Sequence, residues 1–358
     1  MHILVIAEAG VNHNGDIGLA RRMIDAAADA RADAVKFQSF RAAQLASRQA
    51  AKAEYQRITS GSGESQLDML RRLELSETDH EALIGHSNAR GIEFLSTPFD
   101  IESLEMLTTR FGLRTVKISS GDITNAPFLL AAARAAKHIV LSTGMSTLAE
   151  VENALGVLAF GFTGSAAAIP GQAEFGRSFS SAAGKAALRD RVTLLHCTSE
   201  YPAPYAGVNL RAMQAMTEAF RLPVGYSDHT RGSHVALAAV ALGAIAIEKH
   251  FTLDRALPGP DHQASLEPSE LQAMISQIRD LEQALGDGIK RPADSEIGNR
   301  SVVRRSLVAA RPISKGEPFT DQNLACKRPG TGLTPFEYWS LLGRKATRDY
   351  RPDEAIDN

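Results

Sequence analysis

Residues 244–250 read AIAIEKH, an apolar run that ends in the polar side chains of Glu248 and His250. A run that is apolar on both faces is typical of a strand buried in a parallel sheet. Seven earlier runs follow the same pattern, and each also ends in polar residues. They are ILVIAE (3–8), AVKFQ (34–38), IEFLST (92–97), TVKIS (115–119), IVLST (139–143), VTLLHCT (192–198) and LPVGYSDH (222–229).

Segments compatible with helices separate most of these runs. The resulting order, a strand and then a helix repeated eight times, predicts a (β/α)8 TIM barrel of the α/β class. Because the active site of such a barrel lies at the carboxyl ends of its strands, the polar run ends form the candidate site. Helices are predicted at residues 18–30, 77–90, 100–110, 126–136, 147–160, 209–220, 232–243 and 268–285.

The chain has 358 residues, more than the roughly 250 that a barrel needs. Residues 286–300 are rich in Gly, Pro and charged residues, a composition that suits a linker. We therefore predict a barrel domain at 1–285, a linker at 286–300 and a small β-rich module at 301–358. In that module, turn residues separate the β-like segments 304–311, 312–320 and 324–333.

Two connections between predicted elements are long. Residues 41–75 are polar and contain a Gly-Ser patch at 60–65, and residues 161–190 are rich in Gly, Ala and Ser. Long loops after barrel strands are often lids or inserted functional segments. For residues 41–75, a lid and a passive insert both remain open.

Composition excludes several classes of protein. The formal net charge of −2 and the pI near 6.6 show no polyelectrolyte character, which argues against nucleic acid as a general partner. No apolar run reaches the roughly 20 residues of a membrane helix, and no signal peptide is expected before the first run. Cys197 and Cys326 have no paired spacing, so a reducing, cytoplasmic location is expected.

Two histidines end the seventh and eighth runs, His229 in GYSDHT and His250 in EKHF. Neighbouring barrel strands that end in His can place two imidazoles on one metal ion. With no pair of thiolates nearby in the sequence, two imidazoles with oxygen and water ligands suit Mn²⁺ or Mg²⁺ better than zinc. The alternative is a pair of hydrogen-bonded histidines with no metal. His196, within the sixth run, is expected to pack or to support the site.

Two lysines, Lys36 and Lys117, lie inside apolar runs, where an ammonium group needs an anionic partner. Each could bind a phosphate or carboxylate substrate, form a Schiff base or pair with a neighbouring acid. The metal hypothesis favours anion binding. Hydroxyl side chains that could join the lysines as anion donors are Ser119, Ser120, Ser142, Thr143 and Ser227.

Three acids occupy comparable positions. Glu8 and Glu248 end apolar runs, and Asp261 lies in the loop PGPDH after the eighth. Each could act as a general base, hold a substrate hydroxyl or pair with a lysine. The loop GVNHNGD (10–16) carries Asn12, His13 and Asn14, which could contact a polar substrate or cap the next helix.

The motifs IAEAGVNHNGD, DAVKFQ, STPFD, KISSGDITN, LSTGM, HCTSEYPAP, GYSDHT and IEKHFTLD…GPDH occur in this order. Together they resemble the sialic acid synthase family, the phosphoenolpyruvate (PEP)-dependent synthases of nine-carbon 2-keto acids. The C-terminal RRSLVAARPISKGEPFT…KRPGTG resembles the antifreeze-like (SAF) domain of those enzymes. The resemblance spans nearly the whole chain, and it implies a barrel followed by a SAF domain.

The resemblance also implies a domain-swapped homodimer, in which the small domain of one subunit closes the barrel mouth of the other. It implies metal ligands at His229 and His250, with Mn²⁺ favoured over Mg²⁺ or Co²⁺, and an arginine, Arg328, that reaches the acetamido group of the sugar. The candidate catalytic acids are Glu8, Glu248, Asp261 and Asp122. The candidate substrate-binding residues are Lys36, Thr97, Lys117, Ser120, Ser142, Ser199, Tyr201 and Ser227, with Arg328.

The chain departs from the family pattern at two places. Asp122 follows SSG, where the family commonly has Glu, and the shorter acid could change the reach towards the sugar or its catalytic water. The last stretch, RPDEAIDN (351–358), lacks the glycine turn expected near the end of a SAF domain. We expect that difference to affect the edge of the small domain alone.

The implied activity is a carbon–carbon bond-forming transfer, in which PEP condenses with an N-acetylated amino-sugar aldehyde and loses phosphate by C–O cleavage. N-acetylmannosamine, giving N-acetylneuraminate, is the main hypothesis. A 2,4-diacetamido-trideoxyhexose, giving legionaminate or pseudaminate, is the alternative, and a phosphorylated sugar is disfavoured. Two rivals remain open: a metal-independent Schiff-base aldolase on Lys117 or Lys36, and a non-catalytic sugar- or pyruvate-binding barrel.

Overall fold

A computed structural model describes residues 2–47, 49–52, 57, 65–164 and 167–357 of the chain. Contacts within the chain divide it into two compact units, residues 1–286 and residues 287–358. Each unit has its own apolar core. None of the helices in the described ranges combines the length and the apolar composition that crossing a membrane requires.

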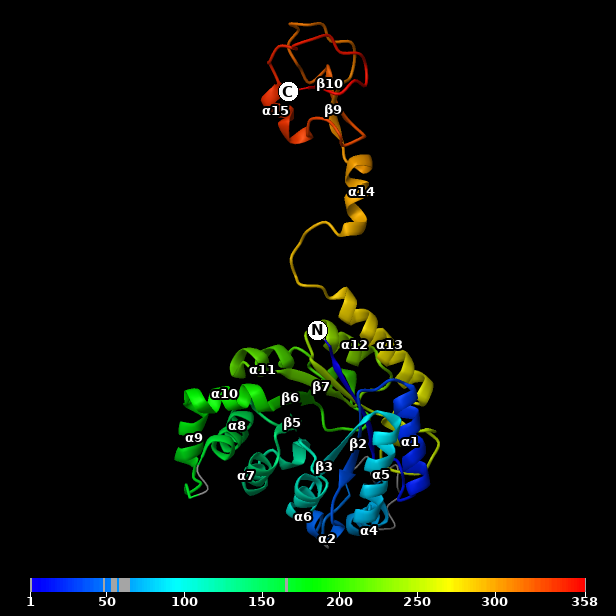
Figure 1. The fold of residues 1–358 in the computed structure, drawn as a ribbon, viewed down its shortest axis with the longest axis vertical. Helices are drawn as coiled ribbons and strands as arrows, with labels where there is room; N and C mark the ends of the chain where they lie inside the picture. Colours follow the sequence, from blue (N-terminus) through cyan, green and yellow to red (C-terminus); the bar gives the residue numbers. More distant parts are fainter. Residues whose placement is uncertain (1, 48, 53–56, 58–64, 165–166, 358) are drawn as a thin grey trace. The chain divides into compact units, whose positions relative to one another are not determined.

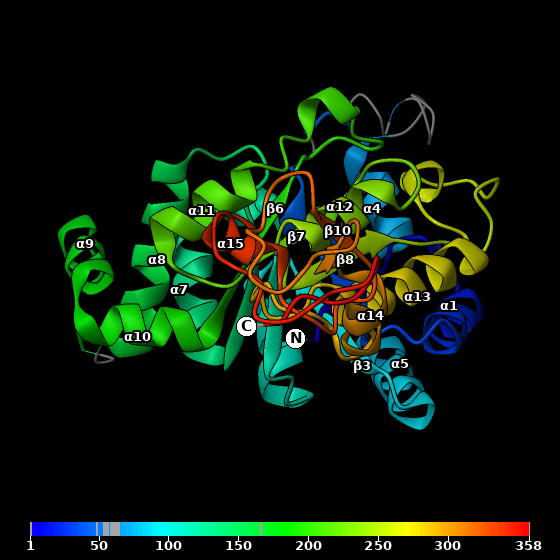
Figure 2. The ribbon, with the colours of Figure 1, turned by 90° about the horizontal axis from the view of Figure 1, so that it is seen from above.

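The first unit is a parallel barrel, as the sequence predicts (Figures 1 and 2). Its strands hydrogen-bond in the order β3-β2-β1-β8-β7-β6-β5-β4, and β3 also lies beside β4. The sheet therefore curls round on itself. The strands are β1 (Leu4–Gly10), β2 (Ala34–Ser39), β3 (Glu93–Pro98), β4 (Thr115–Ile118), β5 (His138–Ser142), β6 (Val192–Cys197), β7 (Val224–Asp228) and β8 (Ala246–His250).

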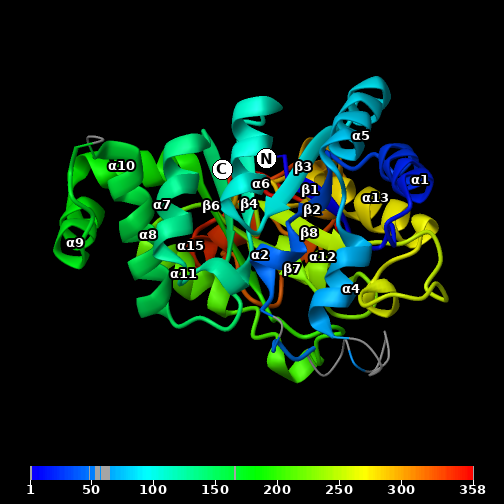
Figure 3. The ribbon, with the colours of Figure 1, turned by 90° about the horizontal axis from the view of Figure 1, so that it is seen from below.

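Helices surround this sheet, and those predicted from the sequence are confirmed (Figure 3). Side-chain caps fix several of their starts: Asp16 accepts hydrogen bonds from Gly18 N and Leu19 N, and Thr147 forms a capping box with Glu150. The helices are α1 (Ile17–Asp29), α5 (Glu77–Arg90), α6 (Ile101–Glu105) continued by a π-helical turn (Met106–Arg110), α7 (Ala126–Ala135), α8 (Leu148–Thr163), α11 (Ala212–Phe220), α12 (His234–Ala241) and α13 (Pro268–Ala284).

The two long connections contain helices that the sequence analysis did not predict. Residues 41–75 include α2 (Ala42–Leu45) and α4 (Gln66–Leu73), while most of the Gly-Ser patch falls outside the described residues. The long connection at 161–190 contains α9 (Gln172–Ser180) and most of α10 (Ala182–Arg191), so it is largely helical. Alanine favours the helix, and the ring of Phe175 packs edge-on to Phe160 of α8, with centroids 5.4 Å apart.

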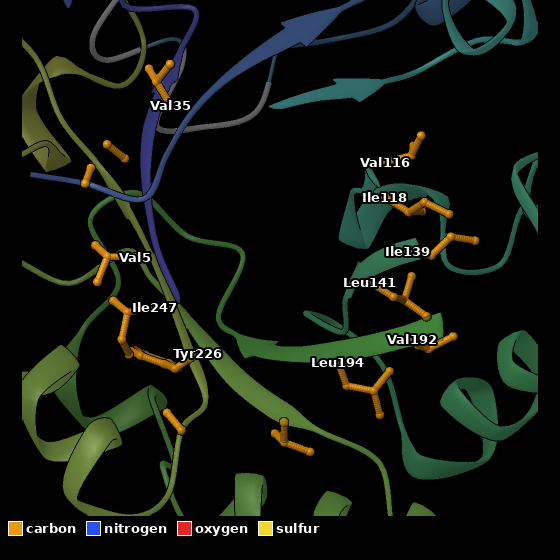
Figure 4. Close-up of a cluster of buried hydrophobic side chains, with 14 of the residues drawn as sticks. Val5, Val35, Val116, Ile118, Ile139, Leu141, Val192, Leu194, Tyr226 and Ile247 are labelled. Atoms are coloured by element: carbon orange, nitrogen blue, oxygen red, sulfur yellow. The ribbon is translucent and has the colours of Figure 1, made fainter. Parts of the chain in front are cut away.

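Alternation along the strands places the apolar core side chains on the outer face of the sheet and the candidate site residues on the inner face. In β8, Ile247 faces the apolar layer under the helices, whereas Glu248 and His250 face the barrel interior. Below the polar interior, apolar side chains such as Ile6 and Leu195 fill the barrel. Figure 4 shows the outward side chains, among them Val5, Val35, Val116, Ile118, Ile139, Leu141, Val192, Leu194, Tyr226 and Ile247.

The second unit is small and partly β-structured. It contains α14 (Asp294–Val303), an antiparallel pair of β9 (Ser306–Ala309) and β10 (Leu324–Lys327), a 3-10 turn (Pro335–Glu337) and α15 (Tyr338–Leu341). Helix α14 thus begins inside the segment expected to be a linker. The segment 312–320 contributes isolated bridges, such as Ile313 with Tyr350, in place of a regular strand.

The end of the chain also pairs with this small sheet. Ala355 bridges Val308, and Ile356 N donates to the carbonyl O of Leu307 at 3.0 Å. Asp353 precedes this pairing with a φ of +67°, a conformation usually taken by glycine. An aspartate therefore makes the turn for which a glycine was expected, and the terminal segment keeps its place against β9.

Candidate active site

A cavity of about 450 Å³ opens at the carboxyl ends of the barrel strands. Its position agrees with the general location of active sites in this fold. Thirteen of the candidate site residues line it, and they come from all eight strands or the loops that follow them. They are Glu8, Lys36, Thr97, Lys117, Ser120, Ser142, Ser199, Tyr201, Ser227, His229, Glu248, His250 and Asp261.

Lys36 extends from β2 into a set of oxygen atoms. Its Nζ lies 2.5 Å from Glu8 Oε2 and 3.6 Å from Glu248 Oε2, and it donates a hydrogen bond of 2.8 Å to Thr97 Oγ1. The four side chains are buried. Because two carboxylates face one ammonium group, the pKa of Lys36 is raised despite the opposing effect of burial. Lys36 therefore stays charged.

Lys117 approaches the same acid from β4. Its Nζ lies 3.6 Å from Glu248 Oε1 and donates to Ser142 Oγ at 2.7 Å. Ser227, the register partner of Glu248 on β7, donates its Oγ to Glu248 Oε1 at 2.8 Å. Burial and the nearby Lys36 lower the pKa of Lys117. Two ammonium groups and several hydroxyls thus converge in the floor of the cavity, which is a suitable place for an anion.

The two acids beside the lysines differ in their proton affinity. Burial raises the pKa of Glu8, Lys36 opposes that effect, and the charge of Glu248 adds to it. Burial acts on Glu248 as well, but Lys117 and Lys36 together outweigh it and lower its pKa. Glu248 is therefore the permanently ionised acid of the pair. Glu8 is the one that takes up and releases a proton more readily near neutral pH.

The two histidines lie side by side at the mouth of β7 and β8. Their ring centroids are 5.5 Å apart, and the ring of Tyr201 lies 4.1 Å from that of His229. Nδ1 of His229 lies 2.6 Å from the carbonyl O of Thr198, which fixes the proton on Nδ1 and turns Nε2 inward. Nδ1 of His250 is buried without a hydrogen-bond partner among the described residues.

These histidines fit a divalent metal ion. Burial lowers the pKa of His229 to about 4, and burial with the neighbouring His229 lowers that of His250 well below its ordinary value. Both imidazoles are therefore neutral, which is the form that binds metal. No group of three His, Cys, Asp or Glu side chains in the described ranges forms a complete site. The protein would supply two nitrogens, and water or substrate would supply oxygens.

Asp261 lies in the loop after β8 and is buried in the cavity wall. Burial alone raises its pKa to about 7. Its backbone O accepts a hydrogen bond from Ser265 Oγ at 2.7 Å, which holds the loop in place. The carboxyl group can thus be neutral and donate, or ionised and accept, around neutral pH.

A close approach of backbone and side chains shapes the cavity beside β5 and β6. Gly144 N donates to Ser120 Oγ at 2.9 Å, and Ser120 Oγ lies 3.1 Å from Cys197 Sγ. A Cβ at Gly144 would collide with Oγ of Ser199 and lie 2.9 Å from Oγ of Ser120. The loop after β5 therefore needs a residue without a side chain at this position.

One wall of the cavity is apolar and comes from the connection after β2. Leu45 and Ala46 lie at the end of α2, and Met69, Leu70 and Leu73 lie on α4. These residues belong to a cluster that packs over the barrel mouth. Helices α2 and α4 of this connection thus form part of the site wall.

Two candidates do not lie in this cavity. Asp122 closes a 3-10 turn after β4, where its carboxylate accepts hydrogen bonds from Ser119 Oγ at 3.3 Å and Asn125 Nδ2 at 3.2 Å. It is not among the lining residues, and a role for Asp122 in positioning the catalytic water stays a prediction. Arg328 belongs to the second unit, where it is exposed and donates Nε to Val303 O at 2.9 Å.

The side chains of Asn12 and His13, in the loop after β1, form hydrogen bonds within the fold and do not line the cavity. Asn12 is buried and donates Nδ2 to Phe251 O and to Ser265 Oγ, both at 2.9 Å. His13 is also buried, and its Nδ1 accepts a hydrogen bond from Gly15 N at 3.0 Å. His196 faces outward from β6, with Nε2 2.7 Å from Val208 O, in keeping with its expected packing role.

Gln38 and Cys197 are among the cavity-lining residues that sequence reasoning missed. Gln38 follows Lys36 by two residues on β2, so strand periodicity alone places it on the same inner face. Cys197 follows Leu195 in the same way on β6, and Leu195 belongs to the inner apolar layer. The alternation signal could have found both.

Comparison with known proteins adds independent information. The model of the NeuB family matches residues 23–290, and that of the SAF domain matches residues 304–358. The chain is 51% identical over 353 residues to N,N'-diacetyllegionaminic acid synthase of Campylobacter jejuni, covering 99% of this chain and 98% of that protein. The corresponding synthase of Legionella pneumophila is 44% identical, with 96% and 90% covered.

A solved structure is similar as well. The crystal structure of N-acetylneuraminic acid (sialic acid) synthetase from Leptospira borgpetersenii, in complex with citrate, shares 33% identity with this chain. The TM-score is 0.68, over 84% of this chain and 90% of that one.

Proposed function

The chain belongs to the NeuB family and is a carbon–carbon bond-forming transferase, and on that premise we propose that it condenses PEP with 2,4-diacetamido-2,4,6-trideoxymannose. The products would be N,N'-diacetyllegionaminate and phosphate. The observation that carries the reaction type is the pair of buried lysines, Lys36 and Lys117, that flank Glu248 in the cavity floor. Such a floor suits a small, highly charged anion like PEP.

Lys36, Lys117 and the hydroxyls around them would hold the phosphate and carboxylate of PEP. Thr97, Ser142 and Ser227 already donate or accept hydrogen bonds within this set. Entry of a multiply charged anion would raise the proton affinity of Glu8 further. When bound at His229 and His250, a divalent ion would supply Lewis acidity for the aldehyde oxygen of the sugar.

The bond changes follow from this placement. The C2–C3 π electrons of PEP form a bond from C3 to the aldehyde carbon, whose oxygen takes up a proton from a neutral cavity carboxyl, for which Glu8 is suited. A water molecule then adds to the cationic C2 and loses a proton to a cavity carboxylate, for which Glu8 is suited by its raised pKa. The tetrahedral intermediate then expels phosphate with the C–O bond electrons, and the C2 hydroxyl gives its proton to the departing phosphate as the 2-keto group forms. Holding both substrates together removes most of the entropic cost of their encounter.

The sugar proposal changes the order of the two hypotheses drawn from the sequence. N-acetylmannosamine was the main expectation, but the higher identities, 51% and 44% over nearly the whole chain, are with synthases named for diacetyllegionaminate. The apolar wall of α2 and α4 also supports this choice. A 6-deoxy, 4-acetamido sugar presents methyl groups where N-acetylmannosamine presents hydroxyls, and methyl groups gain from contact with Met69 and Leu70.

Three further features of the proposal rest on the resemblance. Mn²⁺ is the favoured metal, because two neutral imidazoles with oxygen ligands suit it. Arg328 is proposed to bind an acetamido group of the sugar, since a guanidinium offers several fixed donors. A domain-swapped homodimer is proposed as the assembly that would bring Arg328 to a barrel mouth.

Phosphate release from PEP with Mn²⁺ tests the proposal, comparing 2,4-diacetamido-2,4,6-trideoxymannose with N-acetylmannosamine. We expect release at least tenfold faster with the diacetamido sugar. A preference for N-acetylmannosamine would return the assignment to a neuraminate synthase. Binding of either sugar to folded, metal-loaded protein without phosphate release would favour a non-catalytic barrel.

A Schiff-base aldolase on Lys117 is the second candidate, because burial and Lys36 lower the pKa of Lys117, as such a lysine requires. Borohydride reduction in the presence of pyruvate or substrate separates the two mechanisms. An aldolase would be covalently labelled and inactivated without metal, whereas the proposed synthase would keep its activity after the reagent is removed.

A further inference from the structure

Asp228 and Lys249 form a buried ion pair on the outer face of the barrel, directly before the two histidines in the chain. Lys249 Nζ lies 2.8 Å from Asp228 Oδ2, and both side chains are 0% exposed. The two residues are register partners on β7 and β8. They do not line the cavity, and neither was singled out as a site residue from the sequence.

The pair is the centre of a hydrogen-bond network that clamps the residues around His229. Asp228 Oδ1 accepts hydrogen bonds from Thr230 N at 2.9 Å, from Thr230 Oγ1 at 2.8 Å and from Tyr226 Oη at 3.3 Å. Lys249 Nζ also donates to Thr230 O at 2.5 Å. The peptide groups on both sides of Thr230, the residue after His229, are therefore held by this ion pair.

The same network holds the strand that carries the second histidine. Lys249 immediately precedes His250, and its side chain is attached to the loop of His229 through Thr230. The imidazoles point inward while the ion pair points outward, as strand alternation requires. A change in the outer network would thus move both rings at once.

An ion pair buried this deeply needs a reason beyond stability. Removing two charges from water is costly, and a well-packed apolar pair of similar volume is often as stable. An apolar pair could not fix the orientation of its neighbours. This network holds Thr230, and hence the adjacent His229, relative to Lys249 through five defined hydrogen bonds. Groups that orient metal ligands in this way commonly set metal affinity.

We propose that Asp228 and Lys249 are positioning residues that hold His229 and His250 in the geometry needed for a divalent ion. The inference rests on the proposed metal site of the synthase. It extends that site to a network outside the cavity, one that touches neither substrate nor metal.

The test measures Mn²⁺ affinity without turnover, by electron paramagnetic resonance of free Mn²⁺ in titrations of the purified full-length chain. The variant Asp228→Asn/Lys249→Met removes both charges and the Lys249 bonds while keeping side-chain volumes similar and leaving no unpaired charge. We expect its Mn²⁺ Kd to rise tenfold to a hundredfold. Thermal unfolding in EDTA shows whether the variant remains folded.

A matched control comes from another buried polar network on the outer face. Ser39 lies at the end of β2, two strands away from β8. Its Oγ lies 2.6 Å from His80 Nε2 and 2.6 Å from Ser96 Oγ. Ser39→Ala should destabilise the fold without changing the Mn²⁺ Kd. The single variant Tyr226→Phe removes the long 3.3 Å bond and leaves the ion pair intact, so its Kd should change less than threefold.

A second readout follows the histidine itself in metal-free protein. Long-range ¹H–¹⁵N NMR reports which nitrogen of His229 carries the proton, and the wild type should show one fixed tautomer with the proton on Nδ1. The double variant should show tautomer averaging. This measurement needs neither metal nor activity, and an unchanged tautomer together with an unchanged Kd would overturn the inference.

The variant His250→Ala separates this inference from the proposed metal site. If His250→Ala loses Mn²⁺ binding while the folded double variant binds like wild type, the positioning role is wrong and the metal site stands. If His250→Ala binds Mn²⁺ like wild type, the metal assignment fails, and the positioning role fails with it.

Discussion

Glu8 and Glu248 reach the same ammonium group from neighbouring strands, with Lys36 Nζ 2.5 Å from one carboxylate and 3.6 Å from the other. Glu248 is shared with Lys117, which stabilises its charge, whereas Glu8 forms its ion pair with Lys36 and has a raised pKa. Two chemically identical side chains therefore take different roles. One anchors the lysines, and the other can exchange a proton.

Replacing Lys36 should weaken PEP binding strongly. In Lys36→Met, the anion site loses one ammonium group and Glu8 loses its partner, and a charge-assisted hydrogen bond contributes about 1.5–3 kcal/mol. We expect the KM for PEP to rise at least tenfold, measured by phosphate release. Arg41→Ala is the control, because Arg41 pairs with Glu74 and Glu102 outside the cavity. Equal KM values in both variants would rule out PEP binding by Lys36.

Replacing His250 should abolish metal-dependent turnover and leave the fold intact. His250→Ala removes one of two imidazoles that face each other across 5.5 Å, and the remaining one cannot hold a divalent ion tightly by itself. Circular dichroism checks the fold, and phosphate release across a Mn²⁺ titration checks the activity. Full activity in a folded variant would refute the assignment of His250 as a ligand.

Arg328→Ala should affect the sugar and spare PEP. Arg328 is exposed in the second unit. We propose that it binds an acetamido group of the sugar. The KM for the sugar should increase at least tenfold, with less than a threefold change in the KM for PEP, in steady-state assays that vary one substrate at a time. Lys327→Ala, one residue away and also exposed, is the matched control. A sugar KM equal to wild type would remove the proposed role.

Asp122 should matter less than its place in the KISSGDITN motif indicates. Its carboxylate is occupied by Ser119 and Asn125 within its own turn, so Asp122→Asn should lower kcat less than tenfold. Glu8→Gln, which removes a group suited to proton transfer, should lower kcat by about 10²–10⁴. The comparison uses saturating substrates. A larger loss in Asp122→Asn than in Glu8→Gln would show that the turn rearranges when substrate binds.

Asp261 should make the metal-free fold less stable as the pH rises. Its folded-state pKa is about 7 and its ordinary value is 3.8, so the folded state holds this proton more tightly than the unfolded chain between those values. The stability from the neutral acid is therefore full below about pH 4 and lost as the pH rises through 7, a difference of about 4 kcal/mol at most. Asp261→Asn should flatten the profile.

Urea unfolding in EDTA at several pH values between 4 and 8 measures this effect. The stability of Asp261→Asn relative to wild type should grow from pH 4 to about pH 7 and then level off. A constant difference from pH 4 to pH 8 would contradict the raised pKa. The exposed Asp287 is a suitable control site, because its substitution leaves the buried carboxyl unchanged.

The barrel and most of its site could be predicted because they depend on the pattern of the strands. An apolar run that carries Lys36, Ser142 or Glu248 near its end indicates both a buried strand and the face that bears the reactive side chains. Burial of the strand and the inward direction of its polar end arise from the same two-residue period. The same sequence pattern therefore predicts both the barrel strands and the residues of the candidate site.

What could not be predicted depends on packing and on local backbone geometry. Helix α9 contains Gly176, which disfavours a helix, and its contact between Phe175 and Phe160 is visible only in three dimensions. Asp122 lies in a motif with the right composition, but a 3-10 turn directs its carboxylate to Ser119. Asp228 lies at the polar end of the seventh run, but the alternation along β7 places its side chain on the outer face, away from the cavity.

Side chains along β8 alternate strictly between the barrel interior and the layer under the helices, with a period of two residues. Deleting one residue between Ala246 and Glu248 would send the carboxylate and the imidazole under the helices, and would bring Lys249 into the cavity. Variation in this enzyme can therefore proceed by exchanging single inward side chains. Insertions and deletions are tolerable in the loops that follow the strands. A one-residue shift within a strand would instead remove the site residues from the cavity and the apolar residues from the core.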